Sequence, residues 1–353
     1  MKYERQPYSE TAEYNLAGFG NMKMRVPKFE YPISVKENFR RAYKRENPLW
    51  VPNHMTEFVN TMVATLTGAG EMDWTRKDPY DWFDWFGCEW SFVPLVGGSM
   101  LKPGTRLLDD VRNWEKGVKW PNFDEYDFEG LCGKFMKEKY DPEKITHINI
   151  GLGLTERFVA IMGGYTEAMC AFALEPEAVK EYFAAFVEFT KSFFDRLMKY
   201  VPIDMITYHD DWGTERDTFF SPKMMEELVF EPTKDLMSHI KSRGVCIEHH
   251  SCGNIKRFMP YICRTGADFM QLQARANDIP GLKAEWGDKV GFNIMLTSES
   301  IGNRPITEAI RDTVDKYARG GGLYVGLYAR DQNTLWDACS ELYCYSREYY
   351  DAQ

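Results

Sequence analysis

Two adjacent histidines and a cysteine stand together in the stretch Ile247-Glu248-His249-His250-Ser251-Cys252-Gly253. Side chains on a β-strand alternate between two faces, so a strand here places Glu248, His250 and Cys252 on the same face. Imidazole, thiolate and carboxylate are zinc ligands, and three protein ligands with one open position are typical of a catalytic zinc site. The alternative is a strand with a core cysteine and a hydrogen-bonded histidine, because free cysteine often behaves as a small buried hydrophobe.

A second group of polar residues, His209-Asp210-Asp211-Trp212, follows another apolar run. An imidazole can act as a general acid there, and so can a carboxylate whose pKa is raised by burial. The alternative for Asp210 or Asp211 is structural: the carboxylate accepts hydrogen bonds from loop amides. A third polar stretch contains Glu156 and Arg157, for which the alternative is a structural ion pair.

Length and charge limit the classes of protein to consider. The 353 residues suit one or two domains. The net charge is 43 − 53 = −10, which argues against a general nucleic-acid surface, since such a surface needs a basic face. Aromatic residues make up 15% of the chain, enough to line a large pocket, although aromatic residues more often fill a core.

Cysteine usage and hydropathy predict a cytoplasmic protein. The eight cysteines are spread through the chain without a CxxC pair, unlike a disulfide scaffold. The first seven residues contain no apolar signal core. No run approaches the roughly 18 apolar residues of a membrane span, so no membrane partner is expected.

Eight short strands, mostly separated by helices, are predicted from the chain. Their ranges are 49–52, 89–93, 147–151, 204–211, 245–252, 268–273, 290–296 and 323–328. Ser34 and Glu37 form a capping box before a first helix, and Pro176 opens a long one. Alternating strands and helices imply parallel pairing, and eight such units closing on themselves form an α/β TIM (β/α)8 barrel. Residues 1–34 lack a clean period, so we expect an N-terminal extension followed by a single barrel domain, 35–353.

Active sites of such barrels lie at the carboxyl ends of the strands. Polar and reactive residues fall at these ends in the predicted barrel: Glu89, Trp90, 151–157, His209 to Trp212, His250 to Cys252, Gln271, Gln273, Asn293 and 328–331. Gln271 and Gln273 share a strand face and can line the barrel interior. The sequence therefore predicts one site that draws on several strands.

Several motifs resemble the uroporphyrinogen decarboxylase superfamily, and in particular its corrinoid-dependent methyltransferase branch. The superfamily resemblance rests on His209-Asp210-Asp211-Trp212-Gly213, Phe220-Ser221-Pro222, His250-Ser251-Cys252-Gly253 and Gly266-Ala267-Asp268. Three further stretches look like the O-demethylase methyltransferases that act on aryl methyl ethers such as veratrol: 84–90, 97–100 and 151–157. The similarity runs from about residue 34 to the end of the chain.

The resemblance implies an enzyme that moves a methyl group from an aryl methyl ether, veratrol- or guaiacol-like, to the cob(I)alamin of a partner corrinoid protein. It implies zinc bound by His250 and Cys252, with Glu248 or Asp211 as the third ligand. His209, Asp210 or Asp211 would protonate the leaving phenoxide. The residues expected to bind the substrate are Glu89, Trp90, Phe92, Arg157, Trp212, Gln273 and Met295.

Two departures from the superfamily patterns bear on the activity. Decarboxylases carry an arginine-containing loop for substrate carboxylates, whereas residues 50–54 here contain no arginine. This argues against the alternative of a cofactor-free decarboxylase.

Coenzyme M methyltransferases have a further cysteine ligand near strand eight, which is missing between 324 and 331. Methyl transfer from methylcobalamin to a thiol is therefore less favoured, and a non-enzymatic corrinoid-binding barrel is a further alternative. The sequence leaves the oligomeric state open, a homodimer included.

Overall fold

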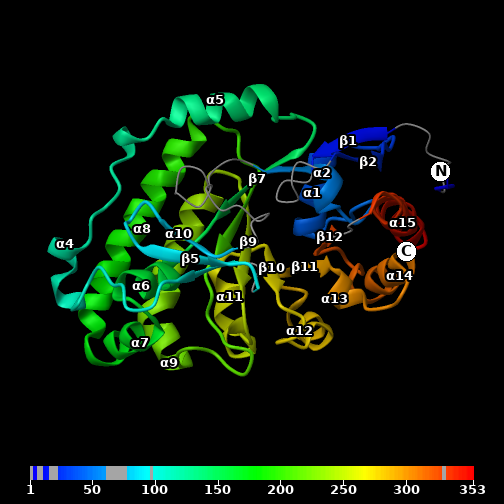
Figure 1. Cartoon of the computed structure of the whole chain (residues 1–353). Helices are drawn as coiled ribbons and strands as arrows, with labels where there is room; N and C mark the ends of the chain where they lie inside the picture. Colours follow the sequence, from blue (N-terminus) through cyan, green and yellow to red (C-terminus); the bar gives the residue numbers. More distant parts are fainter. Residues whose placement is uncertain (1–2, 6–10, 16–22, 61–77, 96–97, 328–330) are drawn as a thin grey trace. The chain divides into compact units, whose positions relative to one another are not determined.

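The structure, a computed structural model, describes residues 3–5, 11–15, 23–60, 78–95, 98–327 and 331–353 (Figure 1). It consists of two compact units. Unit 1 comprises Met1–Val59, Asp141–Ile145 and Asp268–Gln353, and unit 2 comprises Asn60–Tyr140 and Thr146–Ala267. Both units are built from parallel strands that alternate with helices along the chain.

Unit 2 contains three parallel strands in chain order, β7 (Ile145–Ile150), β8 (Met205–His209) and β9 (Cys246–Ser251). These strands are largely buried, as expected for parallel strands that are covered by helices. The unit's helices and helical turns are η2 (Val111–Asn113), α4 (Trp114–Gly117), η3 (Phe123–Glu125), α5 (Phe128–Glu138), α6 (Leu154–Met162), α7 (Tyr165–Leu174), α8 (Pro176–Met198), α9 (Pro222–Met224), a π-helical turn η4 (Met225–Val229), α10 (Phe230–Lys241), η5 (Lys256–Phe258) and α11 (Met259–Thr265).

The long helix α8 follows from its sequence. Pro176 occupies the first turn, where its missing N–H is no loss, and Val179, Phe183, Phe186 and Phe193 form the buried face. Helix α10 packs beside α8, and Figure 1 shows the two running next to each other. Together they bury a large apolar surface of unit 2.

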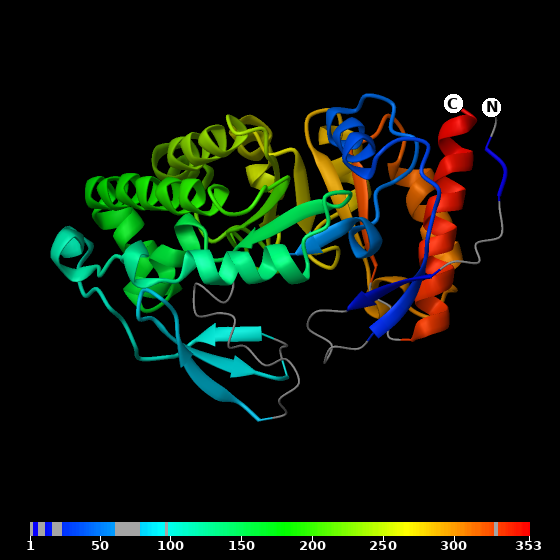
Figure 2. The same cartoon turned by 90° about the horizontal axis from the view of Figure 1, so that it is seen from above.

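Residues 89–93 form a strand, but not the expected second strand of a parallel barrel. They are β5 (Glu89–Val93), which pairs antiparallel with β4 (Tyr80–Phe83) and β6 (Gly98–Leu101). Figure 2 shows this small sheet in cyan. A tight turn explains the difference: the Asp84 N–H donates to the Cys88 carbonyl, and Gly87 has a positive φ of 84°. The chain therefore reverses at once and makes a hairpin.

Unit 1 contains the parallel strands β10 (Phe269–Leu272), β11 (Gly291–Leu296) and β12 (Leu323–Leu327). Its helices are α1 (Val35–Lys44), α2 (His54–Glu57), α12 (Ile279–Trp286), α13 (Ser298–Ile301), α14 (Ile306–Tyr317) and α15 (Gln332–Asp351), and β3 (Phe58–Asn60) ends at the border with unit 2. One hydrophobic core joins β11, β12, α14 and α15; among its members are Leu296, Ile310, Val325, Leu335 and Leu342. The last residue of the expected eighth strand, 328, lies outside the described residues.

The beginning of the chain contains a hairpin of β1 (Thr11–Asn15) and β2 (Lys23–Pro27), whose register pairs Thr11 with Pro27. The expected boundary between an extension, 1–34, and a domain starting at 35 is not tested by this structure and stays a prediction. The capping of the first helix is confirmed, because the Ser34 hydroxyl accepts a hydrogen bond from the Glu37 N–H at 3.2 Å.

The expected first strand, 49–52, is wrong. Only Asn53 forms an isolated parallel bridge, to Val325. Side chains take the backbone donors that a strand partner would use: Leu49 N–H donates to Asn38 Oδ1, and Val51 N–H donates to Ser346 Oγ. The next residue, Pro52, has no N–H to offer to a sheet.

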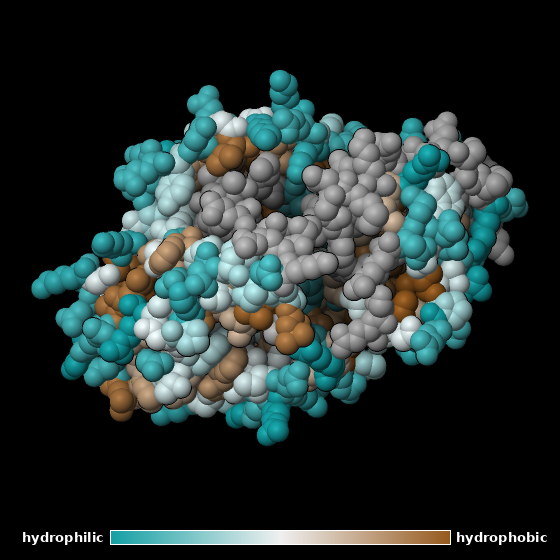
Figure 3. Space-filling view, viewed as in Figure 1, coloured by the Kyte–Doolittle hydropathy of each residue, from teal (hydrophilic) through white to brown (hydrophobic). Residues whose placement is uncertain are grey.

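The α/β architecture of parallel strands and covering helices is thus confirmed, with two of the eight expected barrel strands corrected. Within the described ranges, no helix is both long and apolar enough to cross a membrane. Figure 3 shows hydrophobic side chains in small separate patches on one face, with hydrophilic side chains between them. The exposed large hydrophobic residues among those described all belong to unit 2: Phe83, Leu95, Met100, Leu107, Tyr165 and Leu174.

A buried acid in unit 1 generates a prediction about stability. Glu57 is 3% exposed, and its Oε1 accepts a hydrogen bond from Trp50 Nε1 at 2.9 Å. Burial raises the pKa of Glu57 from 4.5 to about 8, against the opposing effect of that hydrogen bond. Because the folded-state pKa is raised, stability is fully present below about pH 4.5 and is lost as the pH rises through about 8.

We expect Glu57→Gln to remove this fall in stability between pH 5 and pH 8, since the amide has no proton to lose. Urea unfolding of the full chain at several pH values measures it. Glu285→Gln, an exposed change on α12 of the same unit, is the matched control and should keep the wild-type slope. An unchanged slope in Glu57→Gln would show that another group causes the pH dependence.

Candidate active site

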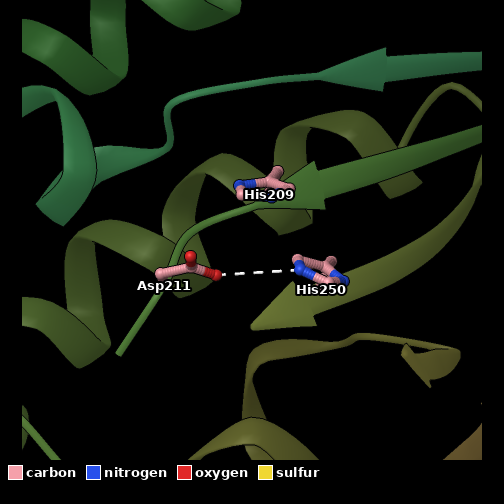
Figure 4. Close-up of side chains that lie close together, drawn as sticks. All are labelled: His209, Asp211 and His250. Atoms are coloured by element: carbon pink, nitrogen blue, oxygen red, sulfur yellow. Dashed lines mark ion pairs between the residues drawn. The ribbon is translucent and has the colours of Figure 1, made fainter. Parts of the chain in front are cut away.

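The carboxyl ends of β8 and β9 bring three possible metal ligands together. His209 ends β8, Asp211 follows it, and His250 lies near the end of β9. One ligand atom of each lies within 4.8 Å of the others, and all three residues are partly buried. Figure 4 shows Asp211 and His250 facing each other, with Asp211 Oδ1 3.7 Å from His250 Nε2.

The register of the parallel pair explains why the histidines meet. His209 of β8 stands directly opposite His250 of β9. Their rings stack with centroids 4.4 Å apart and planes 23° apart. The lone pairs of stacked imidazoles lie in nearly parallel planes and do not converge on one point. The stacking therefore favours one of these histidines as a metal ligand, with the other beside it.

Cys252 lies on the same side of this strand end as His250, as alternation predicts. The distance from Cys252 Sγ to His250 Nε2 is 3.5 Å. The Cys252 backbone N–H donates to Asp211 Oδ1 at 2.5 Å, which fixes the carboxylate next to the cysteine. Asp211, His250 and Cys252 thus form a connected set of oxygen, nitrogen and sulfur donors.

Two separations between donor atoms in this set can be compared with those of a tetrahedral zinc site. A tetrahedral zinc with bonds of about 2.05 Å to nitrogen and about 2.3 Å to sulfur separates these two atoms by about 3.6 Å. The distance of 3.5 Å between His250 Nε2 and Cys252 Sγ agrees with this separation. The separation of 3.7 Å between His250 Nε2 and Asp211 Oδ1 is slightly longer than the about 3.3 Å that such a geometry requires.

His209 has a carboxylate partner on α6. Its Nδ1 lies 2.7 Å from Glu156 Oε2, whose side chain is 11% exposed. Burial lowers the pKa of His209, but the charge and hydrogen bond of Glu156, followed by Asp211 and Asp210, raise it to about 9. Burial in turn raises the pKa of Glu156, against the opposing effect of His209. Glu156 belongs to the predicted polar stretch 151–157 at a strand end, but no catalytic, substrate-binding or metal role was predicted for it.

Asp210 is fully buried and holds the first turn of α6. It accepts hydrogen bonds from Thr155 N–H, the Thr155 hydroxyl, Glu156 N–H and Trp212 Nε1, at 2.6 to 3.1 Å. Burial, followed by the Glu156 charge, raises the pKa of Asp210 to about 7 despite these donors. These contacts agree with the structural alternative, in which the Asp210 carboxylate accepts hydrogen bonds from loop amides. A catalytic role for Asp210 stays a prediction.

Arg157 pairs with Asp84 rather than with its neighbour Glu156. Arg157 Nη1 donates to Asp84 Oδ2 at 2.6 Å, and both side chains are almost fully buried. Asp84 also accepts from Trp90 Nε1 and from the N–H groups of Phe86 and Cys88. This buried ion pair joins α6 to the β4–β5 turn, so Arg157 and Trp90 are already engaged by protein groups.

The remaining predicted residues divide between the two units. Glu89 Oε1 accepts from Lys102 Nζ at 2.5 Å, and Phe92 is 1% exposed. Glu248 is also buried, and its Oε1 accepts from the Thr207 hydroxyl at 2.8 Å, one layer below His250. Gln273 and Met295 belong to unit 1. A substrate role for Glu89, Trp90, Phe92, Arg157, Trp212, Gln273 or Met295, and a ligand role for Glu248, stay predictions.

Two glycines let the loops after β8 and β9 touch. Gly253 has a φ of +77°, and a Cβ there would overlap the carbonyl of Gly213. The Asn254 N–H donates to the Thr214 carbonyl at 2.6 Å beside this contact. Because Asp211 and Cys252 lie one or two residues from these glycines, the contact sets the distance between the two proposed ligands.

Gly253→Ala should therefore destabilise the protein and separate Asp211 from Cys252. Gly244→Ala is the matched control, because Gly244 has a φ of +80° with open space around its Cβ position. We expect about 1–2 kcal/mol of destabilisation for the control, from the left-handed backbone alone, and a larger loss for Gly253→Ala. Denaturant unfolding measures both, and equal losses would contradict the contact.

The buried pair of Arg157 and Asp84 predicts a second stability effect. Arg157→Met leaves the Asp84 carboxylate buried without its cation and should cost about 3–5 kcal/mol of unfolding free energy. Lys180→Met, which breaks the exposed pair of Lys180 and Glu177, should cost less than about 1 kcal/mol. Similar losses in the two variants would show that the buried pair does not stabilise unit 2.

Comparison with known families places the candidate site inside a matched segment. Residues 156–296 match the family model for uroporphyrinogen decarboxylase (URO-D). This segment contains His209, Asp211, His250 and Cys252. A search of curated protein sequences gives no match.

Among solved structures, a methyltransferase from Methanosarcina mazei is similar with a TM-score of 0.50 and 11% sequence identity, over 75% of this chain and 76% of that chain. A xylanase from Caldicellulosiruptor owensensis (TM-score 0.35, 10% identity, 83% and 87% covered) and an aldose reductase from Schistosoma japonicum (0.29, 12%, 60% and 68%) are too distant to carry an argument. The chain is thus similar to uroporphyrinogen decarboxylase-like proteins over residues 156–296, on an α/β fold that it shares with a methyltransferase.

Proposed function

We propose that this protein is a methyltransferase that moves a methyl group from an aryl methyl ether to the cob(I)alamin of a partner corrinoid protein. The observation that carries the proposal is the set of Asp211, His250 and Cys252 at the ends of neighbouring strands, with His250 Nε2 3.5 Å from Cys252 Sγ and 3.7 Å from Asp211 Oδ1. The similarity to uroporphyrinogen decarboxylase-like proteins and the fold shared with a methyltransferase support it. We further propose that residues 35–353 form a single TIM-like barrel domain, whose sheet is supplied by β3 and β7 to β12 rather than by 49–52 and 89–93.

Asp211, His250 and Cys252 are proposed to hold a zinc ion. Asp211 is preferred to Glu248 as the third ligand because its Oδ1 lies 3.7 Å from His250 Nε2, whereas Glu248 accepts a hydrogen bond from Thr207 in the layer below. When bound, zinc supplies a Lewis acid that draws electron density from the ether oxygen of the substrate.

His209 is proposed to donate the proton that the leaving group needs. In the reaction the methyl–oxygen bond breaks with its electron pair left on oxygen, and the methyl carbon is bonded instead by the electron pair of cob(I)alamin. The phenoxide formed has a conjugate acid with a pKa of about 10, similar to tyrosine, so protonation assists its departure. With Nδ1 of His209 next to Glu156, Nε2 is the nitrogen that holds the proton for transfer.

Decarboxylation is the second candidate, because the matched family model is named for it. The absence of arginine from residues 50–54 remains the argument against it. Transfer from methylcobalamin to a thiol is a third candidate, and it would use the same metal ligands. These reactions release different products, so one set of assays separates them.

Purified protein should contain about one zinc per chain and should transfer methyl groups from guaiacol or veratrol to added cob(I)alamin. Cys252→Ala should lose both the metal and the activity, because it removes one of three protein ligands. Cys170→Ala is the matched control, since Cys170 is an exposed free cysteine on α7 of the same unit. Metal analysis and the absorbance change of the corrinoid measure the two properties.

Full activity in a protein without metal would contradict the zinc site. Release of carbon dioxide from porphyrinogen carboxylates, without methyl transfer, would establish the decarboxylase instead. Thiol methylation in the absence of ether cleavage would establish the third candidate. Binding of the corrinoid with none of these reactions would establish a non-enzymatic corrinoid-binding protein.

A further inference from the structure

Glu156, which is not one of the proposed metal ligands, contacts the proposed proton donor His209. Its Oε2 lies 2.7 Å from His209 Nδ1. On its other side, the ring of His209 stacks on the ring of His250, with the two ring centroids 4.4 Å apart. The imidazole of His209 is therefore held at an edge by a carboxylate and on a face by an aromatic ring.

The first turn of α6 holds Glu156 in place through several independent contacts. Asp210 accepts hydrogen bonds from Glu156 N–H at 2.9 Å and from Thr155 N–H at 3.0 Å. The Leu154 N–H donates to the Tyr208 hydroxyl at 2.7 Å, and Gly153 N–H donates to the His209 carbonyl at 2.7 Å. The turn that carries Glu156 is thus attached to the end of β8 on both sides of His209.

The buried ion pair of Arg157 and Asp84 also holds the first turn of α6. Arg157, the next residue, pairs with Asp84 in the β4–β5 turn at 2.6 Å. Glu156 and Arg157 therefore bond to different partners from neighbouring positions. The Glu156 carboxylate is thus directed at His209 Nδ1, and a backbone hydrogen bond from Asp211 acts on the same carboxylate.

The chemistry of the contact determines which hydrogen of His209 stays on the ring when the other is transferred. An ionised carboxylate only accepts hydrogen bonds, so Nδ1 must carry a hydrogen to bond to it. Nε2 is then the nitrogen that gives its proton to the substrate and takes a new one afterwards. Carboxylates that fix a histidine in this way typically set both the tautomer and the ring orientation.

We propose that Glu156 is a positioning residue of the active site, which holds the Nδ1 hydrogen of His209 and aims Nε2 at the leaving oxygen. This inference rests on the proposed role of His209 as the proton donor. Glu156 does not touch the substrate or the metal. Its removal should therefore lower the rate of methyl transfer without lowering zinc content.

The test compares Glu156→Ala and Glu156→Gln with the wild type, and uses Glu167→Gln on the exposed first turn of α7 as control. Spectra of protein labelled with 15N in histidine report whether Nδ1 of His209 carries a slowly exchanging hydrogen. His209→Gln identifies the signal. Metal analysis, kcat and KM for the ether are measured on the same samples.

In the wild type and the control we expect the protected Nδ1 hydrogen. Glu156→Gln should keep it, because the amide oxygen still accepts, and should lose less activity than Glu156→Ala. Glu156→Ala should lose the protected hydrogen and about 10- to 100-fold in kcat, with KM and zinc content unchanged. If Glu156→Ala does not fold, Glu156→Gln and the wild-type spectrum still decide whether the Nδ1 hydrogen is present.

An Nδ1 of His209 without a hydrogen in the wild type would overturn the inference, as would a Glu156→Ala variant with an unchanged spectrum and kcat. Loss of zinc in Glu156→Ala would assign His209 to the metal set and overturn it too. If the wild type transfers no methyl groups from ethers, the proposed function fails, whereas the spectra still decide the role of Glu156.

Discussion

The buried carboxylate of Asp210 is the group on which the geometry of the site depends. It stands at the end of β8 with no exposure to solvent and accepts hydrogen bonds from the first turn of α6 and from Trp212. Hydrogen bonds to an ionised oxygen are stronger than neutral ones, and the amino end of a helix favours negative charge. One side chain thus connects a strand, the following loop and a helix that starts far earlier in the chain.

Attachment of α6 to β8 has a direct consequence for the reactive groups. It brings Glu156 to His209 from one side, while the register of β8 and β9 brings His250 from the other. The contact of Gly213 and Gly253 then sets how closely the two loops approach. Contacts with neighbouring elements therefore hold each reactive side chain in place. Fixed geometry of this kind favours well-aligned proton transfer and metal binding.

β9 carries two neighbouring histidines, His249 and His250, which differ in burial. His249 is fully buried, packs edge-on against Trp212, and has a pKa lowered to about 3 by desolvation. His250 is partly exposed and faces Asp211 and Cys252. A neutral imidazole in the core supports the loop that carries Asp210 and Asp211, whereas the neighbouring imidazole on the other face lies beside Asp211 and Cys252.

Local patterns in the sequence were sufficient for much of this arrangement. The alternation of strands and helices from 147 onward, the cap at Ser34 and the shared side of His250 and Cys252 follow from periods of two and 3.6 residues, which depend only on the covalent chain.

The tertiary structure decided which distant segments pair, because local patterns carry no information about their partners. Residues 89–93 read as a strand, but pairing with β4 and β6 made them part of a hairpin. Asp211 rather than Glu248 lies at His250, and Arg157 pairs with Asp84, 73 positions away, rather than with its neighbour. Partner choice is a property of segments distant in sequence, and only packing brings those segments together.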